Sequence, residues 1–319
     1  MKTAIMVALA VFSCVMSSQL RSEEKITKKD SKEILSYLAS DELGGRGTGQ
    51  AGNKRAADFI AARFKKYGLQ PYDDNGYFQH FNYYKTEYTG FLGLRAVRVS
   101  VDCTNVVGVI KGFTDRCILF GAHFDHLGIK EGNVYNGADD NASGTTALLE
   151  LAEAFAKSGK KPKHTLVFVA FNAEEVGLLG SRYYANHPVL PIKNHELMIN
   201  MDMIGRLRST GNQWRGLLNV VEWNTNRIIT APPILNLQSG NLSNLTMAGW
   251  RSDHAEFNSR GVPVLFFHTG DHPQYHQTTD DEHLINYEGL VDITKFIFNL
   301  VGELEKSSLD IAPPPPPTP

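Results

Sequence analysis

Four predicted strands are each followed by residues that can bind a metal ion or move a proton. The apolar segments at 117–123, 165–171, 197–201 and 262–268 lead into His, Asp and Glu residues at 123–126, 139–140, 174–175, 202 and 276–281, among which two histidines and three carboxylates would converge. Each residue alone has an ordinary explanation as a helix cap, a response to the helix dipole or a solvated loop residue. Together they would form a pocket of mutually repelling carboxylates unless a cation neutralised them. The sequence therefore predicts a metal centre.

The donor types indicate which metal ion this centre would hold. Imidazole and carboxylate donors without a thiolate favour zinc or a similar divalent ion. Five ligands are one too many for a single tetrahedral zinc that also holds water. Two ions about 3.5–4 Å apart, sharing one carboxylate, use five ligands and leave positions open. Water bound there has its pKa lowered towards about 7, so the predicted chemistry is hydrolysis.

The elements that must place these residues alternate between strand and helix. The sequence pattern predicts strands at 97–101, 105–111, 117–123, 165–171, 197–201 and 262–268, and helices at 31–43, 53–67, 144–157, 177–186 and 287–305. Ser31 is the expected N-cap of the first helix, and Gly68 the expected C-cap of the second. The alternation predicts an α/β fold with a mainly parallel sheet covered by helices on both faces. Ligands bind such sheets at the carboxyl ends of the strands.

The composition is that of a soluble globular protein with a sizeable core. Of the 319 residues 42% are apolar and 21% charged, and the net charge is -2. We therefore expect no nucleic-acid partner, because no excess of positive charge is present. Three cysteines are too few for a disulfide scaffold or a thiolate zinc site.

The first 18 residues have the pattern of a secretory signal peptide, with an apolar run at 4–16. Two interpretations of this segment are open. It is either cleaved after Ser17 or Ser18, or it is a lipoprotein signal that ends at Cys14. The protein is thus expected to be periplasmic, extracellular or an outer-membrane or surface lipoprotein, with membrane contact only through a lipid anchor. In an oxidising compartment Cys103 and Cys117 would be able to pair.

The rest of the chain is expected to form one domain at 25–305. Residues 207–250 carry all three tryptophans and a turn-rich stretch, which indicates an insertion beside the main sheet. Residues 306–319 end in APPPPPTP, which is typical of an extended tail outside the fold.

Seven ordered motifs resemble one known family of enzymes. They are LASDELGGRGTGQAGNKRAADFIAARFKKYGL, HFDHLG, NGADDNASG, FNAEEVGLLGS, NMDMIG, RSDHAEF and YHQTTDDEHLIN, and the resemblance covers about residues 38–299. They are similar to the co-catalytic zinc exopeptidases of metallopeptidase family twenty-eight, of which bacterial leucyl-type aminopeptidases are the best-known members. The resemblance implies a three-layer α/β/α sandwich with a mixed, mainly parallel sheet, of the zinc aminopeptidase/phosphorylase-hydrolase type.

The resemblance also implies a role for each residue that matches a motif. His123, Asp140 and Asp202 would bind one Zn²⁺, and Asp140, Glu175 and His276 a second, giving two ions per chain. Glu174 would be the general base. In the family the peptide bond after the bridging aspartate is often cis.

Three further residues receive roles next to this centre. Asp125 is expected to hydrogen-bond the imidazole of His123 and fix its tautomer. Tyr275 would stabilise the oxyanion, with a packed aromatic as the alternative. Arg251 would contact substrate, with a structural salt bridge as the alternative. The remaining histidines near the motifs are not expected to be ligands; these are His126, His254, His268 and His272.

The function expected from the residues and the resemblance is that of a secreted or surface-anchored dinuclear zinc aminopeptidase, a monomer acting on peptides with a free N-terminus. Two alternatives lie in the same family. A single-zinc glutaminyl-peptide cyclase would use Trp223 or Trp250 in its pocket, and a carboxypeptidase would bind the substrate carboxylate through arginines such as Arg206 and Arg208. A non-catalytic binding module is disfavoured because every ligand and the base are present.

Overall fold

The computed structural model describes residues 22–74, 76–89, 94–207, 219–223 and 252–306. Its main feature is an eight-stranded sheet in the order β1-β3-β7-β4-β8-β10-β9, with β2 paired to β3. The strands are β1 (Gln70–Pro71), β2 (Phe78–Thr89), β3 (Arg95–Ile110), β4 (Cys117–His123), β7 (Thr165–Phe171), β8 (His195–Met201), β9 (Asn219–Trp223) and β10 (Val264–His268). The four central strands run parallel to one another in the order β7, β4, β8 and β10. The strands on either side of them are antiparallel, with β3 beside β7 and β9 beside β10. A separate hairpin consists of β5 (Gly128–Lys130) and β6 (Asn133–Tyr135).

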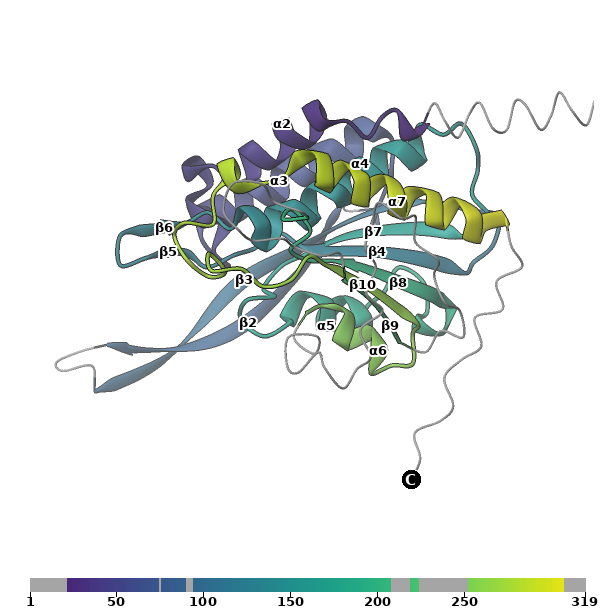
Figure 1. Cartoon of the computed structure of the whole chain (residues 1–319). Helices are drawn as coiled ribbons and strands as arrows, with labels where there is room; N and C mark the ends of the chain where they lie inside the picture. Colours follow the sequence, from purple (N-terminus) through teal and green to yellow (C-terminus); the bar gives the residue numbers. More distant parts are fainter. Residues whose placement is uncertain (1–21, 75, 90–93, 208–218, 224–251, 307–319) are drawn as a thin grey trace, which may run out of the picture.

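Helices cover both faces of this sheet (Figure 1). One layer consists of α2 (Lys28–Leu38), α3 (Ala51–Tyr67), α4 (Gly144–Ala156) and α7 (Tyr287–Lys306), and the other of α5 (Leu179–Asn186) and α6 (His254–Asn258). Each layer encloses its own apolar cluster, with Phe120 and Phe168 on the first side and Phe171 and Phe257 on the second. Because they are covered on both faces, β4, β7 and β8 are buried along their whole length. The three-layer α/β/α sandwich with a mixed sheet is thereby confirmed.

The strands that carry the site agree closely with the sequence pattern, whereas the antiparallel edge differs from it. The segments expected at 97–101 and 105–111 form the single strand β3, and its partner β2 was not expected. The polar residues Asp102 and Thr104 do not interrupt β3, because they pair across the hairpin with Asn82 and His80. The first helix also begins earlier than expected. Its N-cap is Thr27 rather than Ser31, with the Thr27 side chain accepting a hydrogen bond from the backbone N–H of Asp30.

The structure also answers one open question and differs from one expectation. Cys103 and Cys117 are free thiols buried in different apolar clusters, so they do not pair. Within 207–250 the structure describes Leu207 and β9. The strand β9 belongs to the main sheet, where it pairs antiparallel with β10, whereas the sequence indicated an insertion beside the sheet. Of the tail expected at 306–319, Lys306 is instead the last residue of α7. The rest of the tail, the expected signal peptide, Arg208, Trp250 and Arg251 lie outside the described residues.

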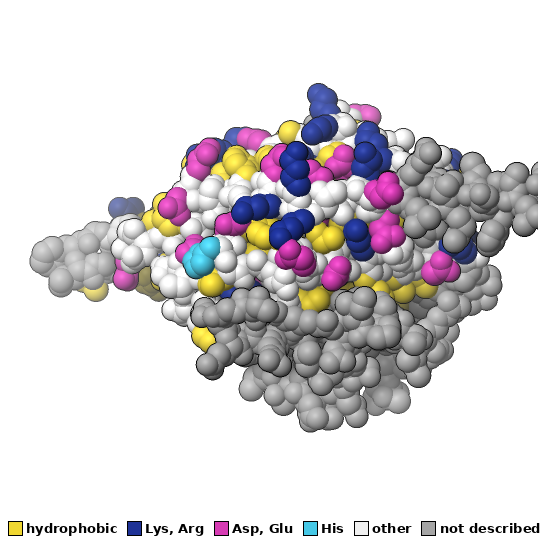
Figure 2. All heavy atoms as spheres, turned by 45° about the horizontal axis from the view of Figure 1, so that its top comes forward, with side chains coloured by type: hydrophobic (Ala, Val, Ile, Leu, Met, Phe, Trp, Pro, Cys, Tyr) yellow, Lys and Arg dark blue, Asp and Glu magenta, His cyan; other side chains and the backbone are white. Residues whose placement is uncertain are grey.

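The outer face of the larger helical layer carries charges of both signs side by side (Figure 2). Among the ion pairs there, Lys28 pairs with Glu288, and Arg63 lies 2.6 Å from Glu33. Such exposed pairs contribute little to stability. In the described part of the chain, no helix combines the length and the apolar character needed to cross a bilayer.

Candidate metal centre

The five residues expected to bind metal meet at one edge of the sheet. His123 ends β4, Asp140 lies in the turn before α4, and Glu175, Asp202 and His276 follow β7, β8 and β10. Because these four strands run parallel, their carboxyl ends share one edge. The positions of the strands thus bring together residues that lie far apart in the sequence.

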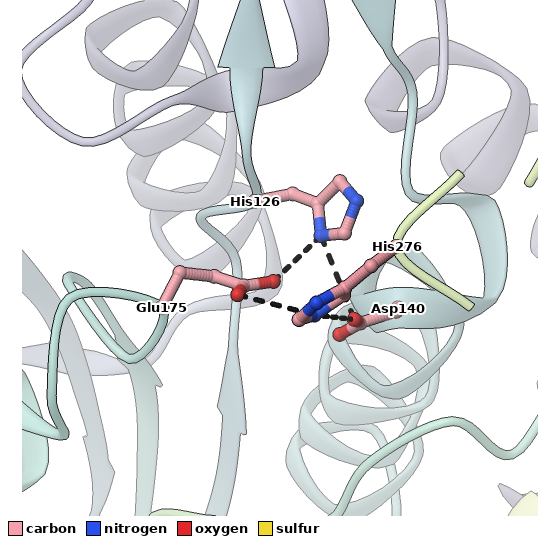
Figure 3. A group of neighbouring side chains, drawn as sticks. All are labelled: His126, Asp140, Glu175 and His276. Carbon is pink, nitrogen blue, oxygen red and sulfur yellow. Dashed lines mark hydrogen bonds and ion pairs between the residues drawn. The ribbon is translucent and has the colours of Figure 1, made fainter. Parts of the chain in front are cut away.

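The side chains form two groups that share Asp140. In the first group, His123 Nε2 lies 3.4 Å from Asp140 Oδ1 and 3.4 Å from Asp202 Oδ1. In the second, His276 Nε2 lies 3.1 Å from Asp140 Oδ2 and 3.2 Å from Glu175 Oε2 (Figure 3). The two oxygens of Asp140 therefore face different groups.

These spacings fit metal binding. Two donor atoms that each lie about 2.0–2.1 Å from one tetrahedral ion are about 3.3 Å apart. The distances of 3.1 to 3.4 Å match that value. In addition, Asp202 Oδ1 is buried and makes no hydrogen bond. Imidazole and carboxylate donors in this arrangement suit a pair of divalent cations.

The pKa values of the site residues show how strongly the carboxylates act on one another and on the histidines. Burial alone would lower the pKa of His123, but the charges of Asp202 and Glu174 outweigh it and raise this pKa. Burial, together with Asp253 and other nearby carboxylates, raises the pKa of Glu174. Burial also opposes ionisation of Glu175, but hydrogen bonds from histidines outweigh burial and lower its pKa. Positive charge is therefore favoured at this edge, whether carried by protons or by cations.

A buried network supports Asp140. One carboxylate oxygen of Asp280 accepts hydrogen bonds of 3.0 Å from the backbone N–H groups of Asp139 and of Asp140. Arg206 Nη2 donates to the other oxygen of Asp280 at 3.2 Å. The peptide bond after Asp140 is cis. Arg206, considered as a substrate-binding arginine in the carboxypeptidase alternative, is instead 1% exposed and engaged in this network.

Arg46 connects the loops on the other side of the site, and the sequence reasoning did not select it. Its guanidinium donates to the carbonyl oxygens of Phe124 at 2.7 Å, Asn136 at 2.7 Å and Gly137 at 2.9 Å, and also to that of Leu38. It is fully buried, and these partners are all backbone carbonyl oxygens. Burial lowers its pKa to about 10, and the carboxylate of Asp140 acts in the opposite direction. The only local signal was an arginine inside the glycine-rich segment GGRGTG.

Asp125 acts differently from the expectation. The group that contacts His123 Nδ1 is the backbone carbonyl oxygen of Asp125, at 3.1 Å, whereas the nearest carboxylate oxygen is 3.9 Å away. The carboxylate accepts hydrogen bonds from the backbone N–H groups of Glu174 at 3.1 Å and Glu175 at 3.3 Å, and from Thr48 Oγ1 at 3.0 Å. Asp125 thus fixes the tautomer of His123 through its main chain and positions two glutamates through its side chain.

The remaining selected residues lie around the two groups. Glu174 precedes Glu175 and belongs to neither group. The ring of Tyr275 stacks on that of His276, with centroids 3.9 Å apart, and 41% of Tyr275 is exposed. His272 bonds to Asp139 at 3.1 Å, outside both groups. His126, which was not expected to be a ligand, is nevertheless part of the second group, together with Asp140, Glu175 and His276.

Comparison with known proteins places the chain in a family. The profile of Peptidase family M28 matches residues 105–301, so the chain belongs to this family. The aminopeptidase YwaD of Bacillus subtilis (strain 168) is 32% identical over 217 residues, which are 63% of this chain and 45% of that protein. Leupeptin-inactivating enzyme 1 of Streptomyces exfoliatus is 27% identical over 271 residues, 82% and 53% of the two chains. The chain thus spans about half the length of these relatives.

Solved structures share the fold over most of the chain. An aminopeptidase from Aneurinibacillus sp. strain AM-1 superimposes with a TM-score of 0.67 at 17% identity, over 89% of this chain and 95% of that one. BSAP, a zinc aminopeptidase from Bacillus subtilis, gives 0.65 at 17% identity, over 90% and 98%. At this level of identity the likeness concerns the fold.

Proposed function

We propose that the protein is a dinuclear zinc aminopeptidase that removes N-terminal residues from peptides. The observation that carries this proposal is the position of Asp140, whose two carboxylate oxygens face two separate groups of donors. A carboxylate placed in this way suits two ions that it bridges. The names of relatives and of solved structures support zinc as the metal and peptides with a free N-terminus as the substrates.

The chain's own residues then have separable tasks. Bound zinc would supply Lewis-acid activation of water. Glu174 takes a proton from the attacking water and delivers it to the leaving amine, because it adjoins the metal-binding residues without belonging to either group. Tyr275, stacked on His276, stabilises the negative charge on the substrate oxygen.

Metal content and substrate choice test this function together. We expect two zinc equivalents per chain. We also expect hydrolysis of aminoacyl-nitroanilides and no hydrolysis of an N-acetylated control. One zinc equivalent with cyclisation of a Gln-initiated peptide would identify a cyclase instead. Hydrolysis from the C-terminal end of an N-blocked peptide would identify a carboxypeptidase, and protein without bound zinc after gentle purification would reject all three.

We further propose that the protein is exported. Support for export comes from the signal-like pattern of residues 1–18. Fractionation of cells that express the full chain should find it outside the cytoplasm. A lipid anchor at Cys14 predicts membrane-associated protein that Cys14→Ser releases, whereas cleavage after Ser17 or Ser18 predicts soluble protein in both cases. A cytoplasmic location would contradict export.

A further inference from the structure

His126 lies next to Glu175 and Asp140 of the second donor group, three residues after His123, which ends β4. Its Nδ1 is 2.7 Å from Glu175 Oε1 and 3.6 Å from Asp140 Oδ2 (Figure 3). The residue is 1% exposed. It therefore either binds the metal or acts on a residue that does.

The distances distinguish these two roles. Donors to one tetrahedral ion are about 3.3 Å apart, as are the pairs that His276 forms with Asp140 and Glu175. The separation of 2.7 Å between His126 Nδ1 and Glu175 Oε1 is too short for two ligands of one ion, but it is normal for a charge-assisted hydrogen bond. The oxygen of Glu175 that faces His276 is the other one, Oε2.

The surroundings hold the ring of His126 in this orientation. Gly137 packs against it so closely that a Cβ at position 137 would lie 2.4 Å from Cδ2 of the ring. The backbone N–H of His126 bonds to the carbonyl oxygen of Arg46 at 3.4 Å. Nε2 is buried without a hydrogen-bond partner, so the hydrogen bond of this ring to Glu175 is made through Nδ1.

We propose that His126 is a positioning residue for Glu175. Its Nδ1–H donates to Oε1 and thereby keeps Oε2 turned towards His276, where the two residues would hold the second ion. This inference rests on the proposed function, since it concerns one of the two proposed ions. It predicts that loss of the donor weakens that ion's binding and leaves the first site, His123 with Asp140 and Asp202, nearly unchanged.

The test measures metal binding by the full chain. Zinc affinities of the two sites are determined by competition with a chelator for wild type, His126→Ala and His126→Asn, with the exposed His187→Asn as control. The amide of asparagine places an N–H donor close to where Nδ1 lies in histidine, but it is a poor zinc ligand. The absorption spectrum of the Co²⁺-loaded protein reports the coordination of the ion independently of activity.

The expected result is that His126→Ala weakens one zinc equivalent about 10- to 100-fold, as loss of an outer hydrogen bond to a ligand does, and that His126→Asn restores most of this affinity. The Co²⁺ bands of His126→Asn should match those of wild type. Equal loss of metal in both variants with altered bands would make His126 a ligand and overturn the proposal, as would an unchanged affinity in His126→Ala. Wild-type protein that binds no second ion would instead reject the dinuclear function itself.

Discussion

Asp125 Oδ1 accepts a hydrogen bond of 3.1 Å from the backbone nitrogen of Glu174, and this bond joins the segments that follow β4 and β7. Asp125 itself is fully buried, and its own carbonyl oxygen contacts His123 Nδ1. One residue therefore sets the orientation of His123 in the first group and the position of Glu174 and Glu175, the residues proposed as base and as ligand of the second ion.

Replacement of Asp125 by asparagine should impair catalysis more than substrate binding. The new amide would place one N–H group against the N–H groups of Glu174 or Glu175, so both glutamates would shift. We expect kcat to fall about 10- to 100-fold with a small change in KM, measured by steady-state kinetics. Thr48→Ala is the matched control, because it removes a single hydrogen bond to the same carboxylate and should cost far less. A kcat of Asp125→Asn equal to that of wild type would refute the positioning role.

Glu174→Gln should retain both zinc ions and lose most of the activity. Glutamine keeps the shape of the side chain but cannot accept the proton. A general base typically contributes 10²–10⁴-fold, so we expect kcat to fall by about that factor. Zinc content measured beside the kinetics separates this effect from loss of metal, and Glu153→Gln on α4 serves as the control for a lost carboxylate. A wild-type rate in Glu174→Gln would show that another group is the base.

Zinc binding should release protons and strengthen as the pH rises. Burial alone would lower the pKa of His276, but the hydrogen bonds that its ring donates to Asp140 and Glu175 outweigh burial and raise this pKa to about 10. Below that pH the metal-free imidazole is protonated, whereas a metal ligand must be neutral. The apparent affinity of the second site should therefore fall about tenfold per pH unit for each proton released as the pH decreases. Chelator competition at pH 6, 7 and 8, with proton release followed in weak buffer, checks this; pH-independent binding would contradict it.

Arg46→Met should destabilise the fold and not only the site. The substitution leaves the carbonyl oxygens of Phe124, Asn136 and Gly137, among others, without their donor. Because a buried unsatisfied group costs about 1–3 kcal/mol, we expect the free energy of unfolding to decrease by about 2–4 kcal/mol. Urea unfolding of the metal-free protein measures it. Arg55→Met is the control, since that exposed arginine bonds to the single carbonyl oxygen of Glu42; an equal loss in both variants would contradict the role of Arg46.

The sequence predicted the parts of the fold whose residues carry the information locally. β4 and β7 begin and end where their apolar runs do, because strands covered on both faces are apolar along their length. The convergence of the site also followed from the sequence, since parallel strands place their carboxyl ends at one edge. By contrast, β2 was missed because nearly all of its residues are partly or fully exposed, so the strand lacks an apolar signature.

The supporting contacts of the site could not be predicted for a different reason. Arg46 acts through backbone carbonyl oxygens, and those are set by the path of the chain rather than by residue types. The same holds for Asp125, where the spacing to His123 indicated proximity but did not distinguish a carboxylate oxygen from a carbonyl oxygen. The partner of His126 depends on which oxygen of Glu175 faces it, which only the assembled site determines.

The position of His276 after the last strand of the sheet has a consequence for biogenesis. During synthesis, a chain that already contains His123, Asp140, Glu175 and Asp202 still lacks a ligand of the second group until the segment after β10 has been made. The proposed peptidase would therefore acquire its second ion only when nearly the whole domain has been translated. A chain truncated before this segment would lack His276 and with it the complete second donor group.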